Sequence, residues 1–482
     1  MKNWKFKGMY LKKGWISPAY VSTDDNGKIL SIGSHSSLAV DESVEGYAIA
    51  PIPNAHSHAF QYVMAGLTEN IPKGHQGDNF WSWRERMYAV ADQVNPEQME
   101  VIASMLYAEM LRLGYDQVVE FHYLNKDSNG RSYNNPNEMA ERLISAAKRV
   151  GMKITMTPVY YRTAGFNQGP SEAQRRFQYE STDSYFSQIE DLISKYQDDS
   201  EVKIGYGQHS LRAAGVEETK EIFAYSSQMP CHIHISEQIQ EVEGSLKHLG
   251  ARPVEWLANE VGMGKNTNLI HSTHITDNEM QSIIRAKANV VICPSTEGNL
   301  GDGYFPISDF VESGGRWCIG SDSHIGINPF EDLRLLDYGQ RMSKQKRNVL
   351  LNDKPGDRAA ISYDTIFDNG HLASGESKSD YFHVGDELDA LIINSHSPLM
   401  TRDANDGRLS TIVYALDNSA IYGRIKSGEW LVRGGLHINH DEIINLMTSR
   451  VIVRLFLMTL FLIMVIWPQV RVKVITFMWV MS

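Results

Sequence analysis

Histidine and carboxylate side chains follow apolar, strand-like runs at widely separated places in the chain. His56 and His58 end the run AIAPIPNAHSH. Residues two apart on a strand point to the same side, so both imidazoles can reach one metal ion. The run PCHIHISE adds two further imidazoles and ends in Glu237, and the run NLIHSTH carries His271. Asp322 follows the apolar run WCIG, where a carboxylate is costly unless it meets a cation or hydrogen-bond donors.

Together these side chains predict a metal site. Three neutral imidazoles and one carboxylate leave zinc a net positive charge and an open position for water, whose pKa the ion lowers to about 7. The run KIGYGQHSLR has no lysine at its end to bridge two ions, which favours one ion. Such sites also accept iron, manganese or nickel. Taken alone, each histidine pair also fits an ordinary buried or surface position.

The elements that must position these residues alternate between strand-like and helical patterns. Helical segments such as PNEMAERLISAAKRVG, which ends in a capping glycine, separate the strand-like runs. This alternation predicts a (β/α)₈ barrel, whose chemistry lies where strands end and loops begin. A doubly wound sheet is the alternative, but the first strand lacks a glycine-rich phosphate turn. The eight expected strands are 48–56, 117–123, 153–161, 203–210, 230–237, 268–274, 289–296 and 316–324.

Both flanks of this centre are rich in short strands and turns. The stretch DDNGK and the turn KSGE are hairpin signals, so we expect a small antiparallel sheet. The predicted organisation is a small β-sandwich domain from residues 1–48 and 376–440, a catalytic barrel over 49–375, and a C-terminal segment over 441–482.

Composition limits the partners and the compartment. The net charge of −12 argues against a nucleic-acid partner, because phosphate binding needs a basic surface. Three cysteines without CxxC spacing fit a reducing compartment, and the N-terminus lacks the apolar core of a secretory signal. We therefore expect a cytoplasmic protein and, as the commonest closed assembly, a homodimer.

The last 32 residues, from Val451, are far more apolar than the rest of the chain. The uncharged stretch from Leu455 to Val470 is shorter than the roughly 20 residues that a spanning helix needs, and Pro468 interrupts it. No membrane span is expected. A buried C-terminal helix, a dimer contact or a shifted reading frame would each explain the run, which has no polar face.

Longer motifs, covering the chain up to about residue 445, resemble the amidohydrolase superfamily and its mononuclear deaminase branch. In detail they resemble the formimidoylglutamate deiminase family, to which the Trp-Ser-Trp-Arg and HSLRA segments point most specifically. The motifs are PNAHSHAFQ (53–61), FWSWRERMY (80–88), EFHY (120–123), HSLRA (209–213), HIHISEQ (232–238), CPSTEGNLGDGYFP (293–306) and GSDSHIGINPFEDLRLLDYGQR (320–341).

The resemblance implies zinc-dependent deamination of N-formimino-L-glutamate, with one Zn²⁺ per subunit. It implies that His56, His58, His234 and Asp322 bind the ion, while His232 turns away. It implies proton transfer by Glu237, with His271 and Asp322 also catalytic. His274 and His324 are expected to support the site rather than bind the ion. The residues implied to bind the dicarboxylate substrate are Gln61, Arg84, Tyr123, His209 and Arg212. The loop after Leu124 runs Asn-Lys-Asp-Ser-Asn-Gly, without the further histidine expected of the family.

Two other functions remain open from the sequence. A deaminase of a cyclic amidine such as guanine would share every metal ligand, although paired arginines favour a dicarboxylate over a base. A binding protein that has lost catalysis would lack Glu237 or Asp322, and both are present.

Overall fold

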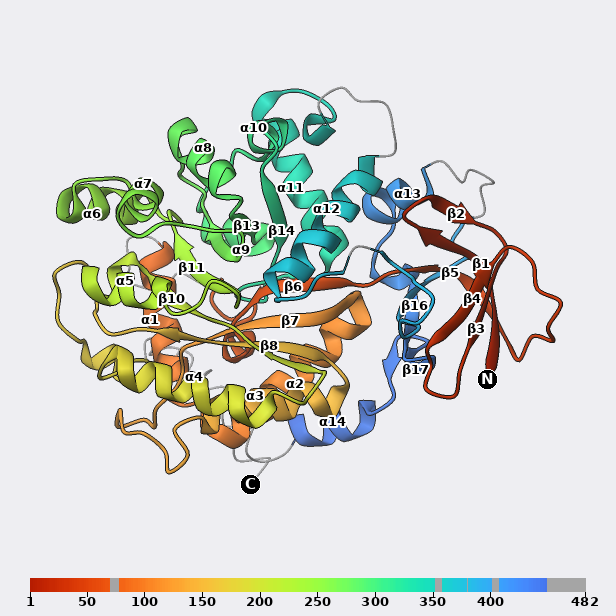
Figure 1. The fold of residues 1–482 in the computed structure, drawn as a ribbon, viewed down its shortest axis with the longest axis horizontal. Helices are drawn as coiled ribbons and strands as arrows, with labels where there is room; N and C mark the ends of the chain where they lie inside the picture. The colour runs from red at the N-terminus through yellow and green to blue at the C-terminus, as the bar shows by residue number, and fades with distance from the viewer. Residues whose placement is uncertain (70–77, 352–357, 379, 401–406, 449–482) are drawn as a thin grey trace, which may run out of the picture.

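The computed structural model describes residues 1–69, 78–351, 358–378, 380–400 and 407–448, and Figure 1 shows their arrangement. The centre of the chain forms a parallel sheet with the strand order β14-β13-β12-β11-β10-β8-β7-β6, and β9 pairs with β8. This confirms the expected (β/α)₈ barrel. The strands are β6 (Ile52–Ser57), β7 (Tyr115–His122), β8 (Lys153–Tyr160), β9 (Val202–Ile204), β10 (Tyr206–Ser210), β11 (Cys231–Ile235), β12 (Thr267–His271), β13 (Asn289–Ile292) and β14 (Arg316–Ile319).

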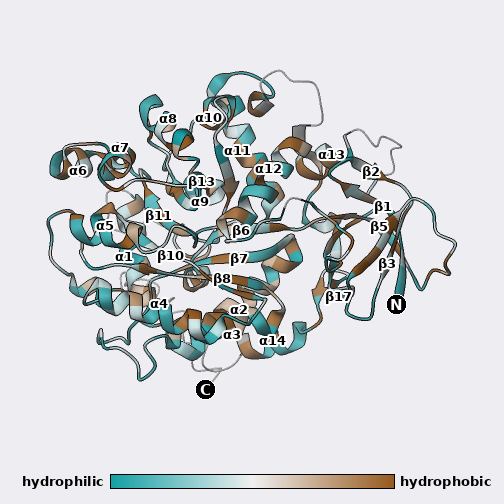
Figure 2. Cartoon of the chain, in the orientation of Figure 1, coloured by the Kyte–Doolittle hydropathy of each residue, from teal (hydrophilic) through white to brown (hydrophobic). Residues whose placement is uncertain are grey.

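Helices surround these strands (Figure 1). In α3 the buried residues recur on one side of the helix, and Gly151 caps its end in the left-handed region at φ 76°, as the sequence predicts. Figure 2 shows hydrophilic and hydrophobic residues mixed within such helices. The barrel helices are α1 (Phe80–Ala91), α2 (Pro96–Leu113), α3 (Glu138–Val150), α4 (Thr182–Tyr196), α5 (Val216–Ala224), α6 (Ile239–Leu249), α7 (Pro253–Trp256), α8 (Asp277–Ala286), α9 (Pro294–Leu300), α10 (Ile307–Glu312), α11 (Pro329–Lys344) and α12 (Arg358–Ala373).

The barrel closes between its first and last strands through a few contacts rather than a full ladder. Ser57 and Asp322 form an isolated parallel bridge. The backbone N–H groups of Ser321 and Asp322 donate to the His56 carbonyl at 3.1 and 3.0 Å, and the His58 N–H donates to the Asp322 carbonyl at 3.2 Å. The seam of the barrel therefore brings the ends of β6 and β14 together.

The two chain ends build one second sheet, as expected. Both predicted hairpins are present, between β3 and β4 and between β16 and β17. The strands form one mixed sheet, and the expectation of antiparallel pairing throughout is wrong, because β1 and β5 pair in parallel. The strands are β1 (Lys2–Leu11), β2 (Gly14–Ile16), β3 (Ala19–Thr23), β4 (Ile29–Gly33), β5 (Glu42–Ile49), β15 (Ala390–Asn394), β16 (Ile421–Lys426), β17 (Glu429–Arg433) and β18 (Leu436–His437). Helices α13 (Arg408–Ala415) and α14 (His440–Met447) complete the described chain.

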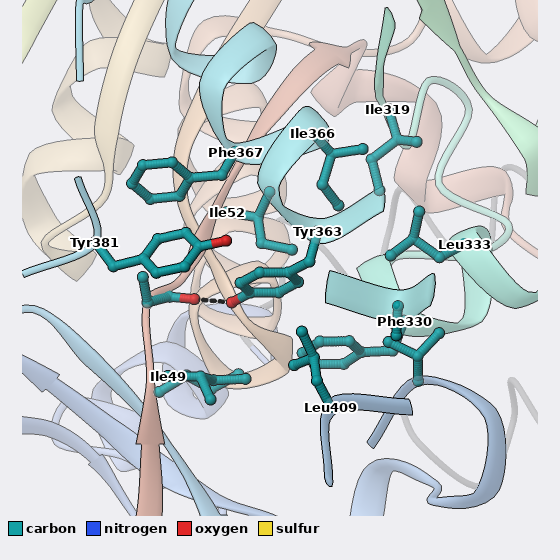
Figure 3. Packing of buried hydrophobic residues seen from close by; sticks show 14 of the residues in the cluster. Ile49, Ile52, Ile319, Phe330, Leu333, Tyr363, Ile366, Phe367, Tyr381 and Leu409 are labelled. Atoms are coloured by element: carbon teal, nitrogen blue, oxygen red, sulfur yellow. Dashed lines mark hydrogen bonds between the residues drawn. The ribbon is translucent and has the colours of Figure 1, made fainter. Parts of the chain in front are cut away.

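The first expected strand, 48–56, is two strands that belong to different sheets. β5 ends at Ile49 and β6 begins at Ile52, so the break falls at Ala50-Pro51, where proline has no N–H for a ladder. Around this break Ile49 and Ile52 pack with Phe330 and Tyr363, and the Tyr363 hydroxyl donates to the Ala50 carbonyl (Figure 3). One apolar cluster thus spans the junction between the two sheets. The expected domain boundaries at 48/49 and 375/376 stay predictions.

Within the described residues, no helix has the length and apolar character needed to cross a membrane. The expectation about the apolar tail, residues 451–482, lies outside the described residues.

Candidate metal centre and active site

Four buried side chains meet at the seam of the barrel. The ligand atoms of His56, His58, His234 and Asp322 all lie within 4.8 Å of one another. The His56 and His58 Nε2 atoms lie 3.4 and 3.2 Å from Asp322 Oδ1, and His234 Nε2 lies 3.0 Å from His56 Nε2. These are the four residues that the sequence resemblance implied as metal ligands.

The geometry of the four side chains fits a single divalent ion. His58 Nδ1 donates to the Phe121 carbonyl at 2.9 Å and His234 Nδ1 to the His209 carbonyl at 3.0 Å, which leaves both Nε2 lone pairs for a metal. Burial lowers the pKa of His56 to about 3 and keeps it neutral, as a ligand must be. Three of the separations between ligand atoms, 3.0–3.4 Å, are close to the edge of about 3.3 Å expected when the ligands lie about 2.05 Å from a zinc ion.

A second group of charged side chains lies beside the cluster. His271 Nε2 lies 3.8 Å from Glu237 Oε1 and 3.7 Å from Asp322 Oδ2. His271 Nδ1 lies 3.2 Å from Glu297 Oε1 on its other side. Burial lowers the pKa of His271, but the surrounding carboxylates outweigh it and raise that pKa to about 10. Burial raises the pKa of Glu237 above the ordinary value of a glutamate.

The backbone is strained where these side chains leave their strands. His271 at the end of β12 has φ 69°, Asp322 after β14 has φ 49°, and Ser236 after β11 has φ 53°. Non-glycine residues in the left-handed region cost of order 1–3 kcal/mol each and persist where the surrounding structure holds them. Three such residues at neighbouring strand ends are typical of a functional site.

One cavity joins the metal cluster to the expected substrate residues. Gln61 Nε2 donates to the Tyr123 hydroxyl at 2.8 Å, and Tyr123 packs against His209 with ring centroids 5.3 Å apart. Much of the remaining wall is aromatic. The residues that line the whole cavity are His58, Gln61, Phe80, Trp83, Arg84, Met87, Tyr88, Tyr123, Tyr161, Phe177, His209, Arg212, His234, Glu237, His271, Leu300 and Asp322.

Two guanidinium groups, those of Arg84 and Arg212, line this cavity and form no ion pair among the described residues. Arg84 lies 5.1 Å from the ring centroids of both Trp81 and Tyr88 and donates to the Tyr88 hydroxyl. The Arg212 guanidinium has one weak contact, to Ser210 Oγ at 3.4 Å. In the part of the chain that the structure describes, neither forms an ion pair, although the charge of Arg212 acts on Glu237 and Glu241 and opposes the rise of their pKa values. In a chain of net charge −12, two unpaired arginines in one cavity make a local site for anions.

Three other histidines lie apart from the ligand cluster. His232 turns away from it, as the resemblance implied, and its Nε2 donates to the Ala373 carbonyl at 3.0 Å. His324 Nε2 accepts the His58 N–H at 3.2 Å and so contacts the ligand-bearing segment without joining the cluster. His274 is half-buried and does not line the cavity.

Two buried carboxylates near the cluster, Glu120 and Glu297, were not predicted from the sequence. Glu120 accepts hydrogen bonds from Ser57 and Ala59, next to the expected ligands, and Glu297 holds His271. Burial raises the pKa of Glu120 to about 7. Each lies in a motif quoted above, EFHY and CPSTEGN, and a charged residue inside an apolar strand was the available signal for Glu120.

Comparisons with known proteins agree with this geometry. The model of the Amidohydrolase family matches residues 48–431. The formimidoylglutamate deiminase of Pseudomonas aeruginosa is 36% identical over 434 residues, which are 90% of this chain and 95% of that protein. The 5-methylthioadenosine/S-adenosylhomocysteine deaminase of Thermodesulfovibrio yellowstonii is 22% identical over 87% of this chain and 91% of its own length.

Solved structures share the whole fold. A crystal structure of an amidohydrolase from Brucella melitensis superposes with a TM-score of 0.87 at 33% identity, over 95% of this chain and 100% of that one. An adenosine deaminase from Xanthomonas campestris with bound zinc has a TM-score of 0.77 at 19% identity, over 94% of this chain and 98% of that one, which supports the fold alone. The matched model and the 36% identity show that this chain belongs to the amidohydrolase family, in which it is a homologue of formimidoylglutamate deiminase.

Proposed function

We propose that this chain hydrolyses N-formimino-L-glutamate to N-formyl-L-glutamate and ammonia, a step of histidine degradation. Water adds to the formimino carbon, its oxygen becomes the formyl oxygen, and the imine nitrogen leaves as ammonia. The observation that carries this proposal is that one cavity is lined by three residues of the ligand cluster, His58, His234 and Asp322, and by two arginines. The identity to the formimidoylglutamate deiminase of Pseudomonas aeruginosa supports the choice of substrate.

Substrate binding falls to the polar wall of the cavity. Arg84 and Arg212 each present a planar fork that can meet a carboxylate with two hydrogen bonds. Gln61, Tyr123 and His209 line the same wall and complete the set of groups that hold the two carboxylates. The substrate is thereby held with its formimino end toward the metal cluster.

His56, His58, His234 and Asp322 would hold the ion. A bound zinc ion supplies a nucleophile at neutral pH, because it lowers the pKa of a water molecule to about 7. Glu237 takes one proton of the attacking water and passes it to the imine nitrogen. It then carries the second proton of that water to the resulting amino group, which leaves as ammonia. No covalent enzyme intermediate is needed.

His271 and Asp322 complete the proton pathway. His271 faces Glu237 and Asp322 with its Nε2 atom, so it can stabilise the oxygen that gains charge during addition. Glu297 contacts His271 at Nδ1 and fixes the direction of the ring. Asp322 is placed to accept a proton from the same oxygen.

The proposal also covers the assembly, location and partners of the protein. We propose one zinc ion per subunit, a homodimer and a cytoplasmic location, with a small dicarboxylate amidine as substrate and no nucleic acid as partner. The excess of negative charge supports the exclusion of nucleic acid.

An ammonia assay with three substrates tests the proposed function. We expect the protein to release ammonia from N-formimino-L-glutamate at a higher kcat/KM than from N-formimino-L-aspartate, and to leave guanine unchanged. Arg84 and Arg212 give the reason, because guanine has no carboxylate for them to bind. Turnover of guanine without turnover of N-formimino-L-glutamate would replace this substrate with a heteroaromatic base, the second reading of the sequence.

A further inference from the structure

The segment Ser57–Ala59 directly follows one candidate metal ligand, His56, and contains a second, His58. It lies at the end of β6, and its residues are almost fully buried. His56 and His58 sit on either side of Ser57, so the path of this backbone decides where two of the four ligand nitrogens lie. The groups that hold the segment therefore influence the cluster without touching its centre.

Glu120, at the end of β7, holds the segment from one side. Its carboxylate is 2% exposed. Oε2 accepts from Ser57 Oγ at 2.6 Å, and Oε1 accepts from the Ala59 N–H at 2.7 Å. The next residue on the strand, Phe121, accepts from His58 Nδ1 at 2.9 Å. One strand end thus fixes the hydroxyl, the backbone and an imidazole of the ligand-bearing segment.

His324, which follows β14, holds the same segment from the other side. Its Nε2 accepts from the His58 N–H at 3.2 Å and lies 3.3 Å from Ser57 Oγ. Because Nε2 accepts a backbone N–H, the ring proton is on Nδ1, which lies 2.9 Å from Ser321 Oγ. The Ser57 hydroxyl therefore lies between Glu120 and His324.

The alternative is that both side chains only satisfy buried polar groups of the fold. Two features point beyond that role. The bonds from β7 reach Ser57, His58 and Ala59, and those from His324 reach Ser57 and His58. His58 is one of the four ligands, and His56, a second ligand, directly precedes the segment. A buried carboxylate is also costly to desolvate, and two of the three groups that donate to Glu120 belong to the segment Ser57–Ala59.

We propose that Glu120 and His324 form a buried clamp that presets the segment Ser57–Ala59 for metal binding. The clamp rests on the metal site of the proposed function and adds to it two positioning residues that do not bind the ion. Without the clamp, zinc binding itself must order the backbone of the segment, and this ordering reduces the free energy of binding. We therefore expect zinc affinity to fall while the fold remains.

Zinc affinity, measured by competition with a chromophoric chelator, tests the clamp independently of catalysis. Glu120→Gln keeps the volume but has one acceptor oxygen, so one side of the clamp loses its partner. Ser57→Ala removes the hydroxyl that links both halves and is mild enough to fold. We expect zinc affinity to fall about 10- to 100-fold in each variant, the usual scale for groups behind metal ligands. The melting temperature of the metal-free protein should change little.

Tyr107→Phe is the matched control. The Tyr107 hydroxyl donates to the same carboxylate oxygen at 2.9 Å but not to the segment Ser57–Ala59, so we expect the affinity of the parent. Parental affinity in both Glu120→Gln and Ser57→Ala would overturn the clamp, and so would an equal loss in Tyr107→Phe. A parent protein that binds no divalent ion would instead overturn the proposed function.

Discussion

Replacing Glu237 with glutamine is expected to lower kcat for ammonia release by about 10²- to 10⁴-fold, the usual contribution of a positioned acid or base. Glutamine has nearly the same shape but cannot carry a proton from the attacking water to the imine nitrogen. Glu237 lines the cavity 3.8 Å from His271 and lies outside the ligand cluster, so the metal content should not change. Steady-state ammonia release and metal analysis on the same preparation measure both effects.

Glu243→Gln is the control for this substitution. Glu243 is an exposed glutamate on α6, and its loss should leave kcat unchanged. Parental turnover in Glu237→Gln would remove this residue from the mechanism. A loss of metal together with turnover would mean that Glu237 supports the ion rather than the proton transfer.

Replacing Arg212 with methionine is expected to lower kcat/KM for N-formimino-L-glutamate by about 10²-fold or more, mainly through KM. Removing one partner of a desolvated charge pair costs about 2–5 kcal/mol, because the remaining charge is left buried and unpaired. Among the described residues the Arg212 guanidinium forms no ion pair and has one weak hydrogen bond, to Ser210 Oγ, so it can bind a substrate carboxylate. Arg212→Lys should recover only part of the loss, because lysine keeps the charge but not the planar fork.

A substrate with one carboxylate makes the arginine test specific. N-formiminoglycine lacks the side-chain carboxylate, so Arg212→Met should penalise it less than the dicarboxylate if Arg212 binds that group. Arg285→Met, at an exposed position on α8, controls for the loss of a positive charge. An equal penalty on both substrates would assign Arg212 to the shared carboxylate, and no penalty on either would take it out of substrate binding.

The fold was predictable where local patterns carry the information. Alternating strand-like and helical runs predict the barrel, and the Lys426–Glu429 turn predicts the hairpin between β16 and β17. The parallel pairing of β1 with β5 was not predictable, because parallel partners are joined by no tight turn and leave no local signal. The continuous apolar run over 48–56 likewise hid the change of sheet at Pro51, since both strands are buried.

In the candidate site, too, local sequence patterns predict some residues, whereas contacts between distant segments could not be predicted. His56 and His58 can be read from their spacing on one strand, and Asp322 from its place after an apolar run. The support around them depends on contacts between segments that are distant in the sequence. Glu120 and His324 are linked through the Ser57 hydroxyl, which contacts both. Glu297 contacts His271 because the fold places α9 beside the end of β12. A single sequence gives the type of these residues but not their partners.

Metal analysis of the purified protein tests the central claim most directly, that four side chains from distant segments hold one divalent ion. We expect about one equivalent of zinc per chain in the parent, and loss of that ion in His58→Asn and Asp322→Asn. His274→Asn, which changes a histidine away from the cluster, should keep the full equivalent. A parent without a tightly held divalent ion, or ligand variants that keep it, would contradict the account.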